Sequence, residues 1–289
     1  MLGHQALERK FIELAATGKL SHAYLFFGDA QVGKFTCALR LAHHFEFGNG
    51  DVAKGTMTEC LVIRPVIEET KESIGISQAR ELKNFLYQLP ANSKFRVAIV
   101  DEAQYLTDQA QNAILKVAEE PPPHGVLILI TPNPDSLIKT LQSRFQKIYF
   151  PRVKEEEIAK WLVKEHKLSA KAANEIAAGS FGRPGFAFEL VGDEESLRIR
   201  NEVKKFLDGK TSWKEAAKNL SDIDNRKNIY PFLKFLIAEL SANPVKNFEI
   251  LSAVTKRLSV MQETSANKRL QLEAALYPTS EKIDKISQH

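Results

Sequence analysis

A glycine-rich segment near the N-terminus constrains the fold of this chain more than any other feature. It reads Gly28-Asp29-Ala30-Gln31-Val32-Gly33-Lys34-Phe35. An apolar, strand-like run over residues 23–27 precedes it, and a helix-like stretch over residues 35–45 follows it. In a strand–loop–helix unit, two glycines at this spacing followed by a lysine form a loop whose backbone N–H groups cradle phosphates. We therefore predict a phosphate-binding loop, with Gly28, Gly33 and Lys34 as nucleotide-contacting residues.

The loop departs from the usual pattern at its last position. Phe35 stands where a Ser or Thr hydroxyl would hold the Mg²⁺ of the nucleotide. Thr36 is next in the chain, but one further step along a helix turns a side chain by about 100°. The loop is therefore suited to ATP or ADP and poorly suited to Mg²⁺ and hydrolysis. The residues leave open whether the loop holds a nucleotide at all.

Two carboxylates follow a second apolar run. Residues 95–100 read as a strand that ends on Asp101 and Glu102. In phosphate-loop proteins a carboxylate after such a strand supports the Mg²⁺ shell, and a neighbouring polar residue orients the attacking water. Asp101 is accordingly a candidate for nucleotide binding, and Glu102 is a candidate catalytic residue.

The distribution of strand-like and helix-like segments predicts the fold class. They alternate over the first half of the chain, which is typical of a parallel sheet with crossover helices. From about residue 151 the segments look helical, so the fold class is α/β followed by all-α. The helices are expected over residues 155–165, 170–178, 199–207, 213–220, 231–240, 248–259 and 266–276. No apolar run approaches the ~18 residues of a membrane span, and two cysteines are too few for a disulfide framework. We expect a cytoplasmic protein without membrane contact.

The order of these motifs resembles that of the AAA+ ATPase domain of clamp-loader subunits, specifically the bacterial DNA polymerase III gamma/tau and delta-prime group. The resemblance covers residues 1–190 closely. Residues 266–273 also look like the Asn-x-x-Leu-x-Leu-Glu signature of that family's collar. The segments that carry the resemblance are His22-Ala23-Tyr24-Leu25-Phe26, the glycine loop, Asp101-Glu102-Ala103, Asn112-Ala113-Ile114-Leu115-Lys116, Glu119-Glu120-Pro121-Pro122 and Ser143-Arg144.

The resemblance implies three domains and two functional arginines. The domains are a P-loop AAA+ domain with a parallel sheet over residues 1–150, a small helical lid over 151–194 and a helical collar for oligomerisation over 195–289. Arg144 matches the arginine finger that reaches the ATP site of a neighbouring subunit, a role that suits an always-charged, bidentate guanidinium. Arg183, in Gly182-Arg183-Pro184, matches the sensor-2 residue of the lid.

Two further departures concern the sensor and the metal. Pro132 falls where the family has a polar sensor-1 residue, which leaves Thr131 and Asn133 as the neighbours that could compensate. Many relatives carry a four-cysteine zinc module, which this chain lacks. The donors Cys37, His43, His44 and Cys60 match no structural zinc spacing, so we expect no zinc and assign no metal ligand.

An intact finger beside an altered nucleotide loop favours a delta-prime-type stator of the DNA polymerase III holoenzyme. The alternatives are an active gamma-type clamp-loader ATPase and another AAA+ DNA-remodelling or helicase-loading protein. The resemblance implies other clamp-loader subunits (gamma/tau and delta types), a sliding clamp and primer-template DNA as partners. The DNA contact is expected to be to the phosphate backbone, with which the formal net charge of +4 is compatible.

Overall fold

The computed structural model describes residues 2–51, 56–68, 71–192, 194–208, 210, 211, 215, 229–240 and 247–263. The chain forms two compact units, Met1–Glu157 and Ile158–His289. Among the helices described, none combines the length and the apolarity that crossing a bilayer requires.

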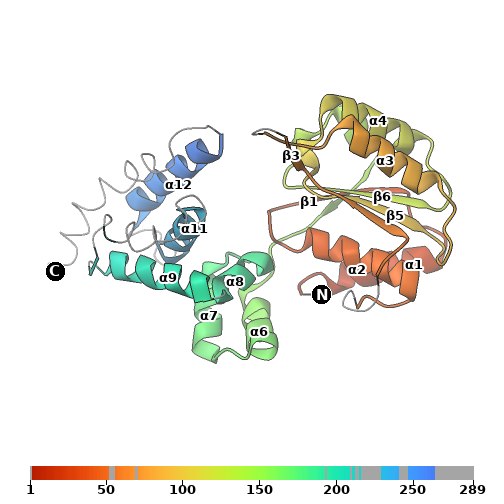
Figure 1. Ribbon diagram of the computed structural model, residues 1–289. Coiled ribbons are helices and arrows are strands. Elements are labelled where there is room, and N and C mark those ends of the chain that lie inside the picture. Colours follow the sequence, from red (N-terminus) through yellow and green to blue (C-terminus); the bar gives the residue numbers. More distant parts are fainter. Residues whose placement is uncertain are drawn as a thin grey trace. The chain divides into compact units, whose positions relative to one another are not determined.

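A parallel sheet forms the centre of the first unit (Figure 1). Its strand order is β2-β5-β6-β1-β7, and every neighbouring pair is parallel. The predicted α/β fold with a parallel sheet is therefore confirmed. The strands are β1 (Ala23–Phe27), β2 (Cys60–Ile63), β5 (Arg96–Val100), β6 (Gly125–Thr131) and β7 (Gln146–Tyr149).

Helices cover both faces of this sheet (Figure 1). Helices α1 and α2 lie on one face, and α3 and α4 lie on the other. The Thr107 hydroxyl accepts a hydrogen bond from the Ala110 N–H and so caps α4, as its place before the helix predicts. The elements are α1 (Gln5–Ala16), α2 (Lys34–Phe47), α3 (Ile76–Tyr87), α4 (Asp108–Glu119), α5 (Lys139–Gln142) and the 3-10 turns η1 (Ala103–Tyr105) and η2 (Pro134–Ser136).

The core lies on both sides of the sheet because successive strand residues point to opposite faces. In β1, Leu25 packs with the residues of α3 and α4, whereas Tyr24 and Phe26 pack with those of α1 and α2. A strand that is buried on both faces is apolar at nearly every position. This explains why β1, β5 and β6 are nearly continuous apolar runs in the sequence.

Several elements of the first unit have no counterpart in the sequence-based expectations, among them three strands. Two of these strands, β3 (Val66–Glu68) and β4 (Lys71–Ser73), form an antiparallel hairpin. The third is β7, which pairs with β1 at the edge of the sheet. Three of its four residues, Gln146, Lys147 and Tyr149, are exposed. An edge strand of this kind lacks the apolar run that reveals the central strands.

Every regular element described in the second unit is a helix. The expected helices at 155–165 and 170–178 are present, with the Ser169 hydroxyl capping the second. Helix α9 packs against α8 and α11, and α11 packs against α12. The helices are α6 (Glu155–His166), α7 (Ala170–Gly179), α8 (Pro184–Val191), α9 (Glu194–Leu207), α11 (Ile229–Leu240) and α12 (Phe248–Glu263).

Some expectations for the second unit cannot be compared with the structure. Of the helix expected over 213–220, only residue 215 is described. The helix expected over 266–276, with the collar signature at 266–273, lies outside the described residues. The division into lid and collar at residue 195, like the boundary at 150, stays a prediction.

Candidate functional site

The predicted phosphate loop connects β1 to α2, so its strand–loop–helix context is as expected. Gly33 is the N-cap residue of α2 with φ 105°, and Gly28 has φ 132°. A Cβ atom at Gly28 would lie 2.4 Å from the Phe150 carbonyl oxygen. The first glycine is therefore required by the close approach of the chain after β7, independently of any ligand.

Lys34 is folded into the loop that it follows. Its Nζ donates hydrogen bonds to the carbonyl oxygens of Gly28 and Asp29, both over 2.6 Å, and the residue is only 6% exposed. Burial lowers the pKa of Lys34 to about 8, although the nearby Asp101 and Asp29 carboxylates oppose this shift. The loop thus keeps a cation at its centre at neutral pH, in a place where an anionic ligand would stabilise the charge.

Replacement of Lys34 by methionine tests this burial through the pH dependence of stability. The folded pKa of about 8 lies below the ordinary value of 10.5, so between these values the unfolded chain binds more protons and stability rises with pH. Relative to Lys34→Met, the wild-type free energy of unfolding is expected to rise between pH 8 and 10 by on the order of 1–3 kcal/mol. Urea unfolding at several pH values measures it.

The control for this experiment is Lys139→Met, which removes an exposed lysine of α5. Its stability difference from the wild type should stay flat over the same pH range. If the difference in free energy of unfolding between the wild type and Lys34→Met is also independent of pH, the Lys34 side chain is solvated and its pKa is not lowered.

The candidate carboxylates Asp101 and Glu102 follow β5 directly, at the same edge of the parallel sheet as the loop. Asp101 interacts electrostatically with Lys34, which brings two predicted site residues together. Glu102 has φ 56°, a conformation that non-glycine residues seldom adopt and that concentrates at functional sites. Partial burial raises the pKa of the Glu102 carboxyl, and the Asp101 and Glu72 carboxylates raise it further.

A residue that sequence reasoning missed also lies at this edge. Arg64, the first residue after β2, has its Nε 3.4 Å from Asp101 Oδ2. Its guanidinium carbon lies 4.5 Å from the centroid of the Phe35 ring. The signal that could have found Arg64 is its place at the end of an apolar strand, which matches the place of Asp101.

The sensor segment after β6 is hydrogen-bonded within its own turn. The Thr131 hydroxyl donates to the Asn133 carbonyl oxygen over 3.0 Å, and the Asn133 side-chain oxygen accepts from the Asp135 N–H over 3.0 Å. Thr131 is fully buried. The Thr131 hydroxyl proton is therefore already used within the turn, whereas the Asn133 bond uses only its side-chain oxygen and not the NH₂ group that could donate to a phosphate.

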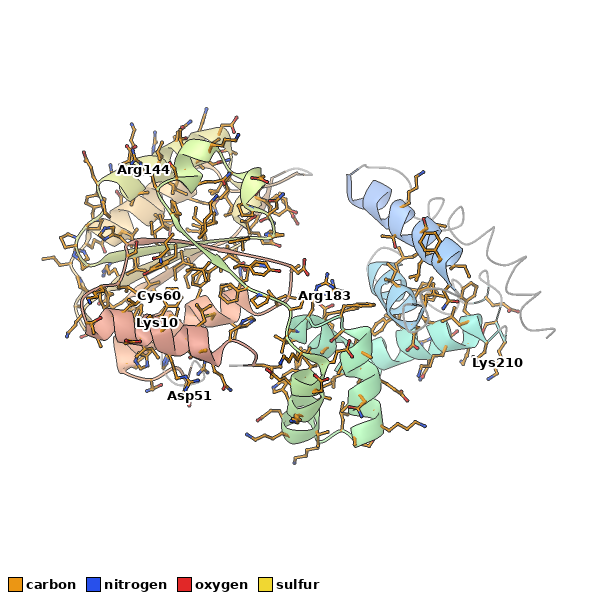
Figure 2. The ribbon with its side chains drawn as sticks, turned by 180° about the vertical axis from the view of Figure 1, so that it is seen from behind. Lys10, Asp51, Cys60, Arg144, Arg183 and Lys210 are labelled. Carbon is orange, nitrogen blue, oxygen red and sulfur yellow. The ribbon has the colours of Figure 1, made fainter. Side chains whose placement is uncertain are left out.

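Arg144 lies after α5, on the side of the sheet that carries α3 and α4 (Figures 1 and 2). Its Nη2 lies 3.2 Å from Glu119 Oε1, and the two side chains are 54% and 42% exposed. An exposed pair of this kind contributes about 0–1 kcal/mol, so it restrains the guanidinium only weakly. The next residue, Phe145, is buried in the core against α4, which fixes the backbone from which Arg144 projects.

Arg183 lies in the second unit at the N-cap of α8 (Figure 2). Its Nε donates to the Ser180 carbonyl oxygen over 3.3 Å, and its guanidinium carbon lies 4.8 Å from the centroid of the Phe186 ring. Because each unit is described by itself, the predicted approach of Arg183 to the phosphate loop stays a prediction.

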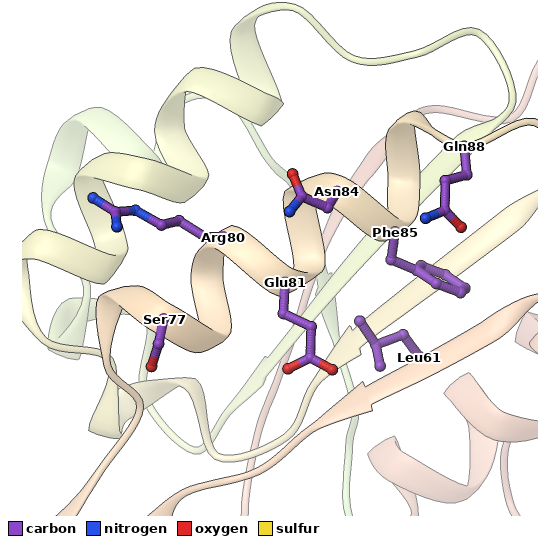
Figure 3. Close-up of a pocket in the computed structure, with 7 residues that line it drawn as sticks. All are labelled: Leu61, Ser77, Arg80, Glu81, Asn84, Phe85 and Gln88. Atoms are coloured by element: carbon purple, nitrogen blue, oxygen red, sulfur yellow. The ribbon is translucent and has the colours of Figure 1, made fainter.

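A surface pocket lies away from these residues (Figure 3). It opens between α3 and the edge strand β2 and contains none of the predicted site residues. Five of its seven lining residues are polar or charged. The residues that line it are Leu61, Ser77, Arg80, Glu81, Asn84, Phe85 and Gln88.

Comparisons with known proteins agree on the type of protein. The sequence profile of the family described as "DNA polymerase III, delta subunit" matches residues 3–154. The DNA polymerase III subunit gamma/tau of Mycobacterium tuberculosis is 35% identical over 137 residues, 44% of this chain and 24% of that protein. The DNA polymerase III subunit delta' of Pseudomonas aeruginosa is 29% identical over 212 residues, 68% of this chain and 64% of that protein. The chain thus spans about a quarter of the gamma/tau relative.

Solved structures show the fold. A gamma subunit-related protein from Thermotoga maritima superimposes with a TM-score of 0.61 at 20% identity, covering 97% of this chain and 99% of that one. A RuvB mutant from the same organism gives a TM-score of 0.51 at 16% identity, over 96% and 88% of the two chains. These likenesses support the α/β AAA+ architecture of the first unit.

Proposed function

The chain belongs to the DNA polymerase III delta-subunit family, and we propose that it is a delta-prime-type subunit of the bacterial clamp loader. In this role it is a stator. It supplies Arg144 in trans to the ATP site of a neighbouring subunit while the loader places a sliding clamp on primed DNA.

One contrast within the first unit carries this proposal. The position that would ligate the metal of the chain's own nucleotide is Phe35, whereas Arg144 is half-exposed and forms an ion pair with the exposed Glu119. A guanidinium at a neighbour's phosphates stabilises the charge of the transition state without any chemistry at its own loop. The helices of the second unit are the proposed means of assembly, with Arg183 as a sensor of nucleotide.

A gamma-type ATPase is the second candidate. It is favoured by the 35% identity to a gamma/tau subunit and by the retained group of Lys34, Asp101 and Glu102. Turnover of ATP by the isolated chain in the presence of Mg²⁺ would select this candidate over the stator. A DNA-remodelling protein with the same fold would instead bind DNA without needing other loader subunits.

Reconstitution tests the proposal directly. The full chain is mixed with gamma/tau-type and delta-type subunits of the same organism and analysed by gel filtration with light scattering. We expect it to elute in one complex with them and to be required for ATP-dependent loading of the clamp on primer-template DNA. Elution of the chain alone, with loading unaffected by its omission, would refute the assignment.

A further inference from the structure

Arg64 and Asp101 occupy equivalent places at the ends of neighbouring strands. Strands β2 and β5 are parallel, with Ile63 opposite Val100, and the Asp101 N–H donates to the Ile63 carbonyl oxygen over 2.9 Å. The first residue beyond each strand therefore lies at the same edge of the sheet. This register brings Arg64 Nε to 3.4 Å from Asp101 Oδ2.

Phe35 supports the same guanidinium from the phosphate loop. Its ring centroid lies 4.5 Å from the guanidinium carbon of Arg64, within the range of a cation–π contact. The ring is partly buried and packs against the core formed with α1 and α2, so packing fixes its place. Other phosphate loops have a metal-binding hydroxyl at this position, whereas this chain has the Phe35 ring in contact with the Arg64 guanidinium.

Magnesium does not fit this set of side chains. The ion requires oxygen ligands at about 2.0–2.1 Å in octahedral geometry. Phe35 has no side-chain oxygen, and the Asp101 carboxylate faces a guanidinium that stays protonated at all physiological pH values. A divalent cation at Asp101 would therefore be repelled by the positive charge of Arg64.

We infer that Arg64 takes the place of the metal, and that it forms with the loop a metal-independent site for the phosphates of a nucleoside diphosphate or triphosphate. A guanidinium carries five N–H donors in a planar fork, and pairing through Nε leaves the donors of the two terminal nitrogens for phosphate oxygens. The Asp101 carboxylate and the Phe35 ring together restrain the Arg64 side chain, which is 59% exposed, and Lys34 supplies the second positive charge. The inference rests on the proposed function in one respect, that this loop is not a site of turnover.

Nucleotide titration of the purified full-length chain tests the inference without any variant. Fluorescent N-methylanthraniloyl derivatives of ATP and ADP are titrated in excess Mg²⁺ and in EDTA. The two dissociation constants are expected to agree within about twofold. Binding at least tenfold tighter in Mg²⁺, or no binding in either condition, would overturn the inference.

Variants assign the effect to Arg64. Arg64→Ala is expected to weaken binding in EDTA about tenfold or more, the scale of a lost charge-assisted contact. The double variant Phe35→Thr/Arg64→Ala is expected to bind more tightly with Mg²⁺ than without it, because a hydroxyl and the Asp101 carboxylate then face the metal. Arg80→Ala, at an exposed arginine of α3, is the matched control and should bind as the wild type does.

Unchanged binding by Arg64→Ala would overturn the role of Arg64. If that variant does not fold, the dissociation constants of the wild type in Mg²⁺ and in EDTA still test whether binding is independent of the metal. Failure of the chain to assemble with loader subunits would refute the proposed function and leave these constants unaffected. The two ideas therefore fail in different experiments.

Discussion

Replacement of Arg144 by alanine is expected to lower ATP turnover about 10³-fold at the neighbouring site that this arginine serves. The reason is that a guanidinium aimed at the transferring phosphoryl group stabilises charge that develops only in the transition state. Turnover stimulated by clamp and primed DNA is measured in the reconstituted loader. Assembly should be unaffected, because the Arg144 side chain is exposed and contributes nothing to the core.

Two further variants separate the finger from general surface charge. Lys139→Ala removes an exposed cation of α5, five residues away, and should leave turnover unchanged. Glu119→Ala removes the ion-pair partner of Arg144 and should change turnover little, because an exposed pair is weak. If the loader containing Arg144→Ala turns over ATP at the wild-type rate, Arg144 is not an arginine finger.

Replacement of Gly28 by alanine is expected to destabilise the first unit by about 2–5 kcal/mol, the sum of a strained backbone and an overpacked contact. Gly28 has φ 132°, and its new Cβ would stand 2.4 Å from the Phe150 carbonyl oxygen. That oxygen belongs to the backbone and cannot rotate away as a side chain could. Urea unfolding of the full chain, followed by far-UV circular dichroism, measures the loss.

Gly18→Ala is the matched control for the contact. Gly18 also has a positive φ, 68°, but nothing lies within 4 Å of the added Cβ, so the cost should be about 1–2 kcal/mol. If Gly28→Ala costs no more than Gly18→Ala, the loop can move away from Phe150. The close approach to Phe150 would then not require this glycine.

The sequence was sufficient for the central part of the fold because of the way the sheet is buried. β1, β5 and β6 are covered on both faces, so each is a nearly continuous apolar run in the sequence. The edge strand β7 is exposed at three of its four residues and lacks that pattern. The hairpin of β3 and β4 has strands of three residues each, too short for periodicity to be seen.

The candidate site was predictable only in part, for a similar reason. The spacing of Gly28, Gly33 and Lys34 is local in sequence, and Asp101 follows an obvious strand. Arg64 is brought to Asp101 by the pairing of β2 with β5, and no local pattern encodes which strands will be neighbours. The contact of Arg64 with Phe35 also depends on that strand order.

Phe35 therefore has a different meaning in the structure than in the sequence. In the sequence it is a missing hydroxyl, whereas in the structure it is one wall of an arrangement that holds a guanidinium beside Asp101. This favours a loop that binds phosphate without a metal over a damaged ATPase site. Metal-independent binding at this loop agrees with a subunit that contributes to ATP turnover at a neighbour's site, through Arg144.

The central claim is that this chain serves a neighbour's ATP site and not its own. The most direct measurement compares steady-state ATP turnover of two reconstituted loaders, one with Glu102→Gln at the chain's own site and one with Arg144→Ala. We predict wild-type turnover for Glu102→Gln and a severe loss for Arg144→Ala, with both complexes intact by gel filtration. Loss of turnover with Glu102→Gln, together with wild-type turnover for Arg144→Ala, would contradict the account.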